Sequence, residues 1–230
     1  MQPLLMRLKQ RDPMVEIHVL APSWSAPLLS RMPQVDAIIE NPFPHGRFDW
    51  AGRKALGCRL ASADFQQAYV LPNSWKSALV PFFARIPERI GYSGEARFIL
   101  LNRRFPNSTL PRLVDRYAAL AGEFSDPTPE PRLATTPEQQ RAARTALGLP
   151  LEAAPVIFCP GAEYGPAKRW PAHHFAALAR RLDAPVWLVG SAKDAPIGED
   201  IARLSEGAAL NLCGRTTLEQ ALDLIAGARA

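Results

Sequence analysis

The 230-residue sequence has few cysteines and no long apolar segment. Its three cysteines, Cys58, Cys159 and Cys213, show neither a pairing pattern nor the spacing of a metal site. We expect free thiols, with Cys159 and Cys213 buried because they lie in apolar runs. No apolar run approaches the roughly 18 residues of a membrane-spanning helix, and the first residues become charged too early for a signal peptide. The sequence therefore predicts a cytoplasmic protein.

Several common site signatures are also absent. The sequence contains neither a G-x-G-x-x-G fingerprint nor a Walker A run, and no residues are spaced as metal ligands. The net charge is +5, but the basic residues form no dense stripe with interleaved aromatic residues. These absences argue against nicotinamide-dependent dehydrogenases, P-loop NTPases and nucleic-acid-binding proteins. The charge favours an acidic small ligand, a phosphorylated glycolipid or an anionic membrane surface as partner.

Short apolar runs alternate with segments of helical spacing along almost the whole chain. This alternation is typical of parallel sheets built through right-handed crossovers, and so predicts an α/β protein. In the first half, the expected strands cover 15–22, 36–40 and 67–72, and the clearest helices cover 51–62 and 109–122. In the second half, the expected strands cover 154–160, 185–190 and 209–214, and the expected helices cover 136–147, 172–182, 194–205 and 217–228.

A proline-rich segment separates the two halves. Residues 123–140 hold four prolines and few apolar side chains. The preceding helical pattern ends at Gly122, a common position for a helix terminus. We therefore assign 1–122 and 136–230 as two Rossmann-like domains and 123–135 as the linker between them.

Three loops follow the expected strands of the second domain and carry its candidate chemistry. They read PGAEYGPAKRWP (160–171), GSAKD (190–194) and GRTTLEQ (214–220). Each loop leaves its strand through a glycine and enters a helix. Ligands of open parallel sheets bind outside the carboxyl ends of the strands, and helix N-termini offer free N–H groups to anions. Lys168 adds a point charge suited to a diphosphate, and Asp194 is able to accept hydrogen bonds from ribose hydroxyls.

Each of these loops also has an ordinary structural explanation. A glycine after a strand is common turn chemistry, and Lys168 and Arg169 fit a solvated surface. Asp194 fits a helix cap, and so do Thr216 and Thr217, because the spacing to Glu219 or Gln220 resembles a capping box. Three such loops at one sheet edge favour an anionic nucleotide ligand, but they do not identify it.

Five stretches of the chain resemble the lipopolysaccharide heptosyltransferases of glycosyltransferase family 9. PNSWKSALVPFFARIPERIGYSGE and PGAEYGPAKRWP are specific to that resemblance. LAPSWSAPLLSRMPQVDAIIENPFPHG, LVGSAKD and NLCGRTTLEQALDLIA extend it over nearly the whole chain.

The resemblance implies a GT-B fold with an acceptor-side first domain and a donor-binding second domain. It implies inverting transfer of L-glycero-D-manno-heptose from ADP-heptose to the inner core of lipopolysaccharide, without a required metal or other cofactor. Because that acceptor is lipid-linked, it also implies peripheral contact with the inner membrane. Lys168 would contact the donor phosphate, Asp194 the ribose and Thr216 the surroundings of the adenine. The predicted donor-binding residues are Gly161, Lys168, Gly190, Asp194 and Thr216.

Two segments of the family pattern have no counterpart in the sequence. These are an initial Gly-Asp loop, whose Asp would be the general base, and a later loop resembling SNDSGLMH. We therefore expect a chain truncated at both ends, assign no catalytic base, and expect these 230 residues alone to be inactive. The alternatives are a nucleotide-binding protein without turnover and a sugar-nucleotide epimerase of the UDP-GlcNAc type, which shares the GT-B fold. Selectivity for ADP over UDP would separate the epimerase from the transferase.

Overall fold

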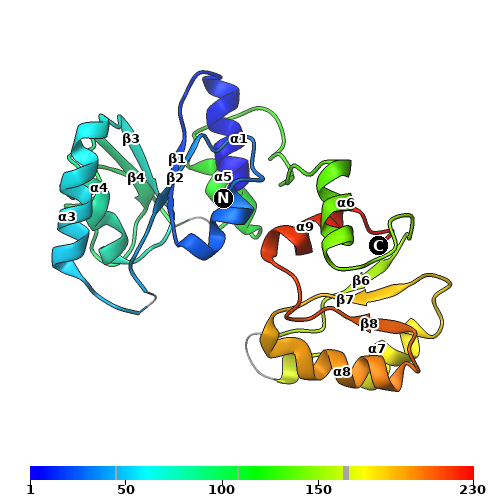
Figure 1. Cartoon of the computed structure of the whole chain (residues 1–230). Helices are drawn as coiled ribbons and strands as arrows, with labels where there is room; N and C mark the ends of the chain where they lie inside the picture. The colour runs from blue at the N-terminus through cyan, green and yellow to red at the C-terminus, as the bar shows by residue number, and fades with distance from the viewer. Residues whose placement is uncertain (45, 108, 163–165) are drawn as a thin grey trace. The chain divides into compact units, whose positions relative to one another are not determined.

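The computed structural model describes residues 1–44, 46–107, 109–162 and 166–230. All the pairs of strands that it describes are parallel, and helices alternate with the strands along the chain (Figure 1). The expected α/β class is confirmed.

The chain forms two compact units, Met1–Leu133 and Ala134–Ala230. The division falls within the proline-rich segment that the sequence marks as a linker. Each unit has its own sheet structure and its own apolar clusters.

The second unit contains one three-stranded sheet in the order β6-β7-β8. In the central strand, Val186 lies opposite Val156 of β6 and Ala209 of β8. The strands are β6 (Val156–Phe158), β7 (Val186–Leu188) and β8 (Ala209–Asn211). The helices are α6 (Pro137–Ala146), α7 (Ala172–Ala179), α8 (Ala195–Leu204) and α9 (Leu218–Ala226), with short 3-10 turns η4 (Pro166–Lys168) and η5 (Ala192–Asp194).

Helices cover both faces of this sheet, as Figure 1 shows. Successive side chains of a strand point to opposite faces. Val186 and Leu188 accordingly belong to the apolar cluster under α7 and α8, while Trp187 and Val189 belong to the cluster under α6 and α9. Burial on both faces explains why these strands read as uninterrupted apolar runs.

The strands of the second unit are shorter than their apolar runs predict. The first run was expected to form a strand over 154–160, but β6 covers only Val156–Phe158. Pro155 and Pro160 flank this strand, and Pro185 directly precedes β7. Proline has no N–H to donate to a ladder, so it limits a strand from either side.

The first unit contains two parallel sheets, β1-β2 and β3-β4-β5, with no ladder between them in the described ranges. The strands are β1 (His18–Ala21), β2 (Ala37–Glu40), β3 (Gln67–Val70), β4 (Glu88–Tyr92) and β5 (Arg103–Phe105). The α-helices are α1 (Gln2–Arg11), α2 (Ala26–Leu29), α3 (Trp50–Leu60), α4 (Leu79–Phe83) and α5 (Leu113–Ala119). The 3-10 turns are η1 (Ser23–Ser25), η2 (Ala61–Ala63) and η3 (Trp75–Ala78).

Two apolar clusters cover the larger of these sheets. Leu4 of α1 and Leu120 beyond α5 pack with Ile90 of β4, while Leu79 of α4 packs with Val70 of β3. These contacts fix α5 beside the carboxyl end of β4. The position of α5 matters because it lines the cavity described below.

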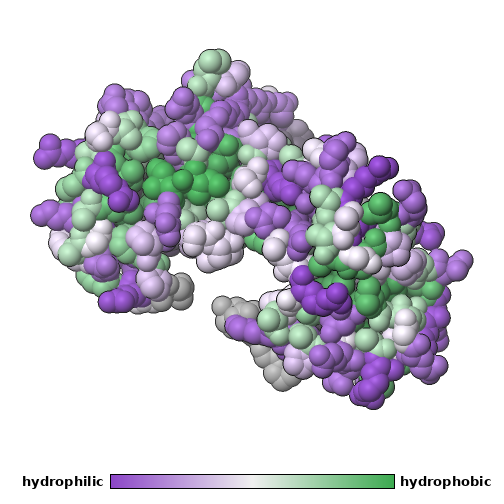
Figure 2. Space-filling view, viewed as in Figure 1, coloured by the Kyte–Doolittle hydropathy of each residue, from purple (hydrophilic) through white to green (hydrophobic). Residues whose placement is uncertain are grey.

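The surface of the first unit includes an apolar patch around β1 and β2 (Figure 2). Ile38 of β2 is 36% exposed, whereas Val186, Trp187 and Leu188 of the second unit are almost completely buried. None of the helices in the described residues combines the length and apolarity that crossing a membrane requires.

Candidate functional site

The three glycine-containing loops of the second unit meet at the carboxyl edge of its sheet. Gly161 follows β6, Gly190 follows β7, and Gly214 follows β8. The backbone N–H of Gly214 donates to the carbonyl of Gly190 at 2.9 Å, so the second and third loops are directly bonded. Parallel strands place their carboxyl ends side by side, which is why loops so far apart in sequence come together.

Glycine suits these positions because the loops pack closely. A Cβ at Gly161 would lie 2.5 Å from Oδ1 of Asp194, and one at Gly190 would lie 3.0 Å from Cβ of the same residue. A Cβ at Gly214, whose φ is +74°, would lie 2.9 Å from Cα of Ala192. The structure therefore brings together three of the predicted residues, Gly161, Gly190 and Asp194.

The carboxylate of Asp194 caps its own turn. Its Oδ2 accepts hydrogen bonds from the backbone N–H of Ser191 at 2.9 Å and from Oγ of Ser191 at 2.7 Å. This pair forms a capping box at η5, directly before α8. The structure thus shows Asp194 in the capping role that the sequence also allowed. The contact of Asp194 with a ribose stays a prediction.

Thr217, rather than Thr216, caps the last helix. Oγ1 of Thr217 accepts from the backbone N–H of Gln220 at 3.2 Å, and Oε1 of Gln220 accepts from the N–H of Thr217 at 2.9 Å. Thr216 precedes this capping box and is half-buried in the third loop. The role of Thr216 beside an adenine stays a prediction.

Replacing Thr217 with alanine is expected to lower the free energy of unfolding by about 1 kcal/mol, because the first turn of α9 loses its side-chain cap. Urea denaturation of the two proteins measures the difference. Thr216→Ala is the matched control and should have a smaller effect. A loss in Thr216→Ala as large as that in Thr217→Ala would contradict the assignment.

Lys168 ends η4 on the loop that follows β6, and its side chain is exposed. Trp170 is exposed two residues later and stacks on His174 of α7, with ring centroids 5.4 Å apart. Residues 163–165 of the same loop lie outside the described residues. Lys168 therefore belongs to one of the three loops at the carboxyl edge of the sheet, where the three glycines lie. Its contact with a phosphate stays a prediction.

The thiol of Cys213 is buried behind these loops, as expected, whereas Cys159 is exposed. The expectation for Cys159 was wrong because the residue lies just past Phe158, where β6 ends and the sheet no longer covers it. Burial, together with nearby Asp194 and Cys159, raises the pKa of Cys213 to about 11. Cys213 is therefore a neutral thiol near pH 7 and is unsuited to act as a nucleophile.

The described residues contain no group of three or more histidines, cysteines or carboxylates placed to hold a metal ion. The absence of a metal requirement stays a prediction.

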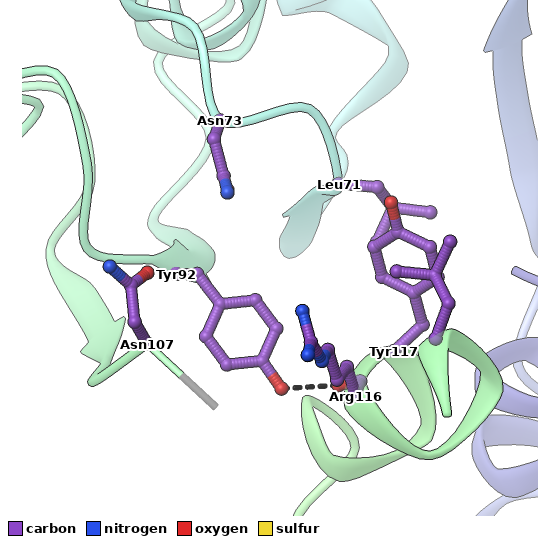
Figure 3. Close-up of a pocket in the computed structure, with 7 residues that line it drawn as sticks. Leu71, Asn73, Tyr92, Asn107, Arg116 and Tyr117 are labelled. Carbon is purple, nitrogen blue, oxygen red and sulfur yellow. Dashed lines mark hydrogen bonds between the residues drawn. The ribbon is translucent and has the colours of Figure 1, made fainter. Parts of the chain in front are cut away.

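The first unit contains a cavity that the sequence patterns do not predict. It has a volume of about 340 Å³ and lies at the carboxyl edge of β3-β4-β5, beside α5 (Figure 3). Its lining residues are Leu71, Asn73, Tyr92, Asn107, Leu113, Arg116 and Tyr117. The available signal was that Asn73 and Asn107 each follow a strand by a few residues, as ligand-binding residues of parallel sheets often do.

The sequence and the structure are similar to those of known transferases. A profile described as glycosyltransferase family 9 (heptosyltransferase) matches residues 53–230. Lipopolysaccharide heptosyltransferase 2 of Salmonella typhimurium is 43% identical over all of this chain and 71% of its own length. Lipooligosaccharide heptosyltransferase 2 of Haemophilus influenzae is 45% identical over 99% of this chain and 71% of its own length.

The same relationship holds in three dimensions. The solved structure of Escherichia coli ADP-heptose LPS heptosyltransferase II superposes with a TM-score of 0.89 at 39% identity, over 99% of this chain and 72% of that one. The glycosyltransferase family 9 structure from Veillonella parvula, at 16% identity, shares the fold with a TM-score of 0.85.

The two parallel α/β units and the superposition on a solved heptosyltransferase identify the fold as the GT-B class of glycosyltransferases. The profile covers more than half of the chain, and relatives above 40% identity align with all of it. The chain belongs to glycosyltransferase family 9, the heptosyltransferases.

Proposed function

We propose that this protein transfers heptose from ADP-heptose to the inner core of lipopolysaccharide. One observation carries the proposal: the heptosyltransferase similarity extends over the same second unit in which Gly161, Gly190 and Gly214 pack at one sheet edge. An edge built this way lets a nucleotide diphosphate approach the backbone closely and places it near the N-termini of α7, α8 and α9.

The transfer is a single displacement with inversion. The acceptor hydroxyl oxygen bonds to the anomeric carbon of the heptose while the bond from that carbon to the phosphate oxygen of ADP breaks. Negative charge develops on the departing diphosphate, and Lys168 together with the helix N-termini stabilises it. The hydroxyl proton leaves to a base that we assign to no residue of this chain. No metal enters this scheme, in which Lys168 and the helix N-termini supply the positive charge at the leaving group.

The proposal includes the place of action. A lipid-linked acceptor implies a cytoplasmic enzyme in peripheral contact with the inner membrane, and the net charge of +5 supports attraction to an anionic surface. Nucleic acid is not among the proposed partners.

Replacing Lys168 with alanine is expected to weaken ADP-heptose binding by about tenfold or more, because one charge-assisted contact to the diphosphate is lost. Isothermal titration calorimetry of both proteins with ADP-heptose measures this change. Arg181→Ala is the matched control, since Arg181 is exposed beyond the opposite end of α7. Equal affinities of the unchanged protein and Lys168→Ala would refute the donor site.

Nucleotide preference and turnover separate the remaining alternatives. ADP should displace bound ADP-heptose from the protein, whereas UDP should not. Preference for UDP would favour an epimerase. Tight ADP-heptose binding without heptose transfer to a heptose-deficient lipopolysaccharide would bear out the expected inactivity of these 230 residues alone, and would equally fit a protein that only binds nucleotides. The relatives are named as heptosyltransferases, which favours transfer over both.

A further inference from the structure

Asn211, the last residue of β8, forms hydrogen bonds in two directions. Its Oδ1 accepts from the backbone N–H of Cys213 at 3.0 Å, and its Nδ2 donates to the backbone carbonyl of Ala195 at 3.2 Å. We propose that Asn211 is a positioning residue for ADP-heptose, because it fixes the start of α8 relative to the third glycine loop. This inference rests on the proposed function, which places ADP-heptose at the sheet edge that these two segments form.

The bond to Cys213 shapes the third loop. An asparagine that accepts from the backbone N–H two residues later forms an Asx turn, which reverses the chain locally. Gly214 follows at once with a φ of +74°, and its N–H donates to the carbonyl of Gly190 at 2.9 Å. The third loop therefore leaves β8 in a conformation that Asn211 sets, and it is bonded there to the second loop.

The bond to Ala195 fixes the start of α8. Ala195 is the first residue of that helix and directly follows Asp194. The carboxylate of Asp194 closes the capping box with Ser191 and lies against Gly161. A shift of Ala195 would therefore carry Asp194 with it and change the spacing between the first and second loops.

Gly198 shows that α8 is shaped to receive the side chain of Asn211. Glycine is unfavourable in the interior of a helix, yet Gly198 lies there and is buried. A Cβ at this position would lie 2.2 Å from Oδ1 and 2.6 Å from Cγ of Asn211. The helix and the strand also share an apolar cluster through Ile201 and Ala209. Apolar contacts are not directional, whereas the amide bonds fix one position of α8 against β8.

The functional consequence follows from the cost of ordering a binding site. If the start of α8 and the third loop moved independently, ADP-heptose would have to order both when it binds, and its affinity would fall by that cost. Asn211 joins the two segments before any ligand arrives. Both polar atoms of its amide are bonded to the protein, so Asn211 acts through Asp194 and the third loop.

Replacing Asn211 with alanine is expected to weaken ADP-heptose binding by about tenfold, as measured by isothermal titration calorimetry. Asn211→Ser keeps a short acceptor for the N–H of Cys213 but does not reach Ala195. It should therefore lose less affinity than Asn211→Ala. Affinities of Asn211→Ala and Asn211→Ser equal to that of the unchanged protein would overturn the proposal.

A double-mutant cycle tests whether Asn211 acts by its contact with α8. Gly198→Ala alone should weaken ADP-heptose binding by about tenfold, because the added methyl group displaces the amide of Asn211. Combined with Asn211→Ala, the methyl group has room, so the double variant should bind no more weakly than Asn211→Ala alone. If the two losses of affinity multiplied instead, Asn211 and α8 would not be acting as one unit.

Arg144→Met is the control for a general loss of stability in the same unit. Arg144 donates to the carbonyls of Ala153, which precedes β6, and Gly227, which follows α9, so it acts at the opposite edge of the sheet. At a temperature where tryptophan fluorescence shows every variant folded, Arg144→Met should bind ADP-heptose as the unchanged protein does. A loss as large as that of Asn211→Ala would mean that loosening anywhere in the unit weakens binding, and would overturn the positioning role.

The unchanged protein separates this inference from the proposed function. If it does not bind ADP-heptose, the proposed function fails, and the inference fails with it. If it binds ADP-heptose and the Asn211 and Gly198 variants bind equally well, only the inference fails.

Discussion

Replacing Arg144 with methionine is expected to lower the free energy of unfolding by about 2–4 kcal/mol, because three carbonyl groups lose a charged donor. Arg144 is 6% exposed at the end of α6. Its NH1 donates to the carbonyls of Leu151 at 2.6 Å and Ala153 at 2.8 Å, and its NH2 donates to the carbonyl of Gly227 at 2.8 Å. It thereby joins the connection before β6 to the end of α9.

Methionine is the informative substitution because it keeps an unbranched apolar stem. The guanidinium carbon lies 5.4 Å from the ring centroid of Trp187, so a thioether preserves part of that packing while removing every donor. Removing the buried charge also relieves its desolvation cost, which offsets part of the loss.

Urea denaturation followed by tryptophan fluorescence measures the effect of Arg144→Met. Arg141→Ala is the matched control, because Arg141 lies on the same helix and is exposed. The control should change the free energy of unfolding by less than about 0.5 kcal/mol. If both variants unfolded at the same urea concentration as the unchanged protein, the buried guanidinium would not be holding the second unit together.

Adding a methyl group at Gly57 is expected to destabilise the first unit by about 2 kcal/mol, although the same change in an exposed helix stabilises. Gly57 lies in α3 where that helix packs against α4. A Cβ there would lie 2.6 Å from the carbonyl oxygen of Val80 and 2.6 Å from Cβ of Phe83. The backbone of α4 would have to move, since neither atom is the end of a flexible side chain.

The sign of the change in Gly57→Ala is the decisive observation in a urea titration. Gly94→Ala is the matched control, because the nearest atom to its new Cβ is the carbonyl oxygen of Asn73 at an ordinary 3.5 Å. We expect Gly94→Ala to be close to neutral. A Gly57→Ala protein as stable as the unchanged one would mean that α3 and α4 pack less closely than described.

Much of the fold follows from local sequence patterns. The alternation of apolar runs and helical segments predicts the parallel α/β class. The spacing of Thr216 or Thr217 to Glu219 or Gln220 predicts a capping box, which the structure contains at Thr217 and Gln220. The apolar run predicts a longer strand than β6, because the run extends over Pro155 and Pro160 and a proline donates no ladder hydrogen bond. The same apolar run predicts a buried Cys159, which is exposed, because an apolar run does not reveal where the strand within it ends.

The candidate sites divide in the same way. Glycines after strands marked the second unit's loops, and the residue types suggested Lys168 for a diphosphate and Asp194 for a ribose. The family resemblance repeated these two roles and added that of Thr216, and all three stay predictions. The cavity around Arg116 was not anticipated, because its residues come from three strand ends and a helix that the sequence separates by up to 46 positions, from Leu71 to Tyr117. No short motif links such residues.

Periodicity, proline positions and capping pairs act over a few residues, so the linear chain already specifies the elements, their order and the family. Contacts across the sheets instead join residues that are far apart in the sequence. Asp194 lies against Gly161, and Arg116 stands between Tyr92 and Tyr117, because parallel strands bring their carboxyl ends to one edge. Which side chains share a site therefore depends on strand order and helix packing, and these emerge when apolar faces are buried together.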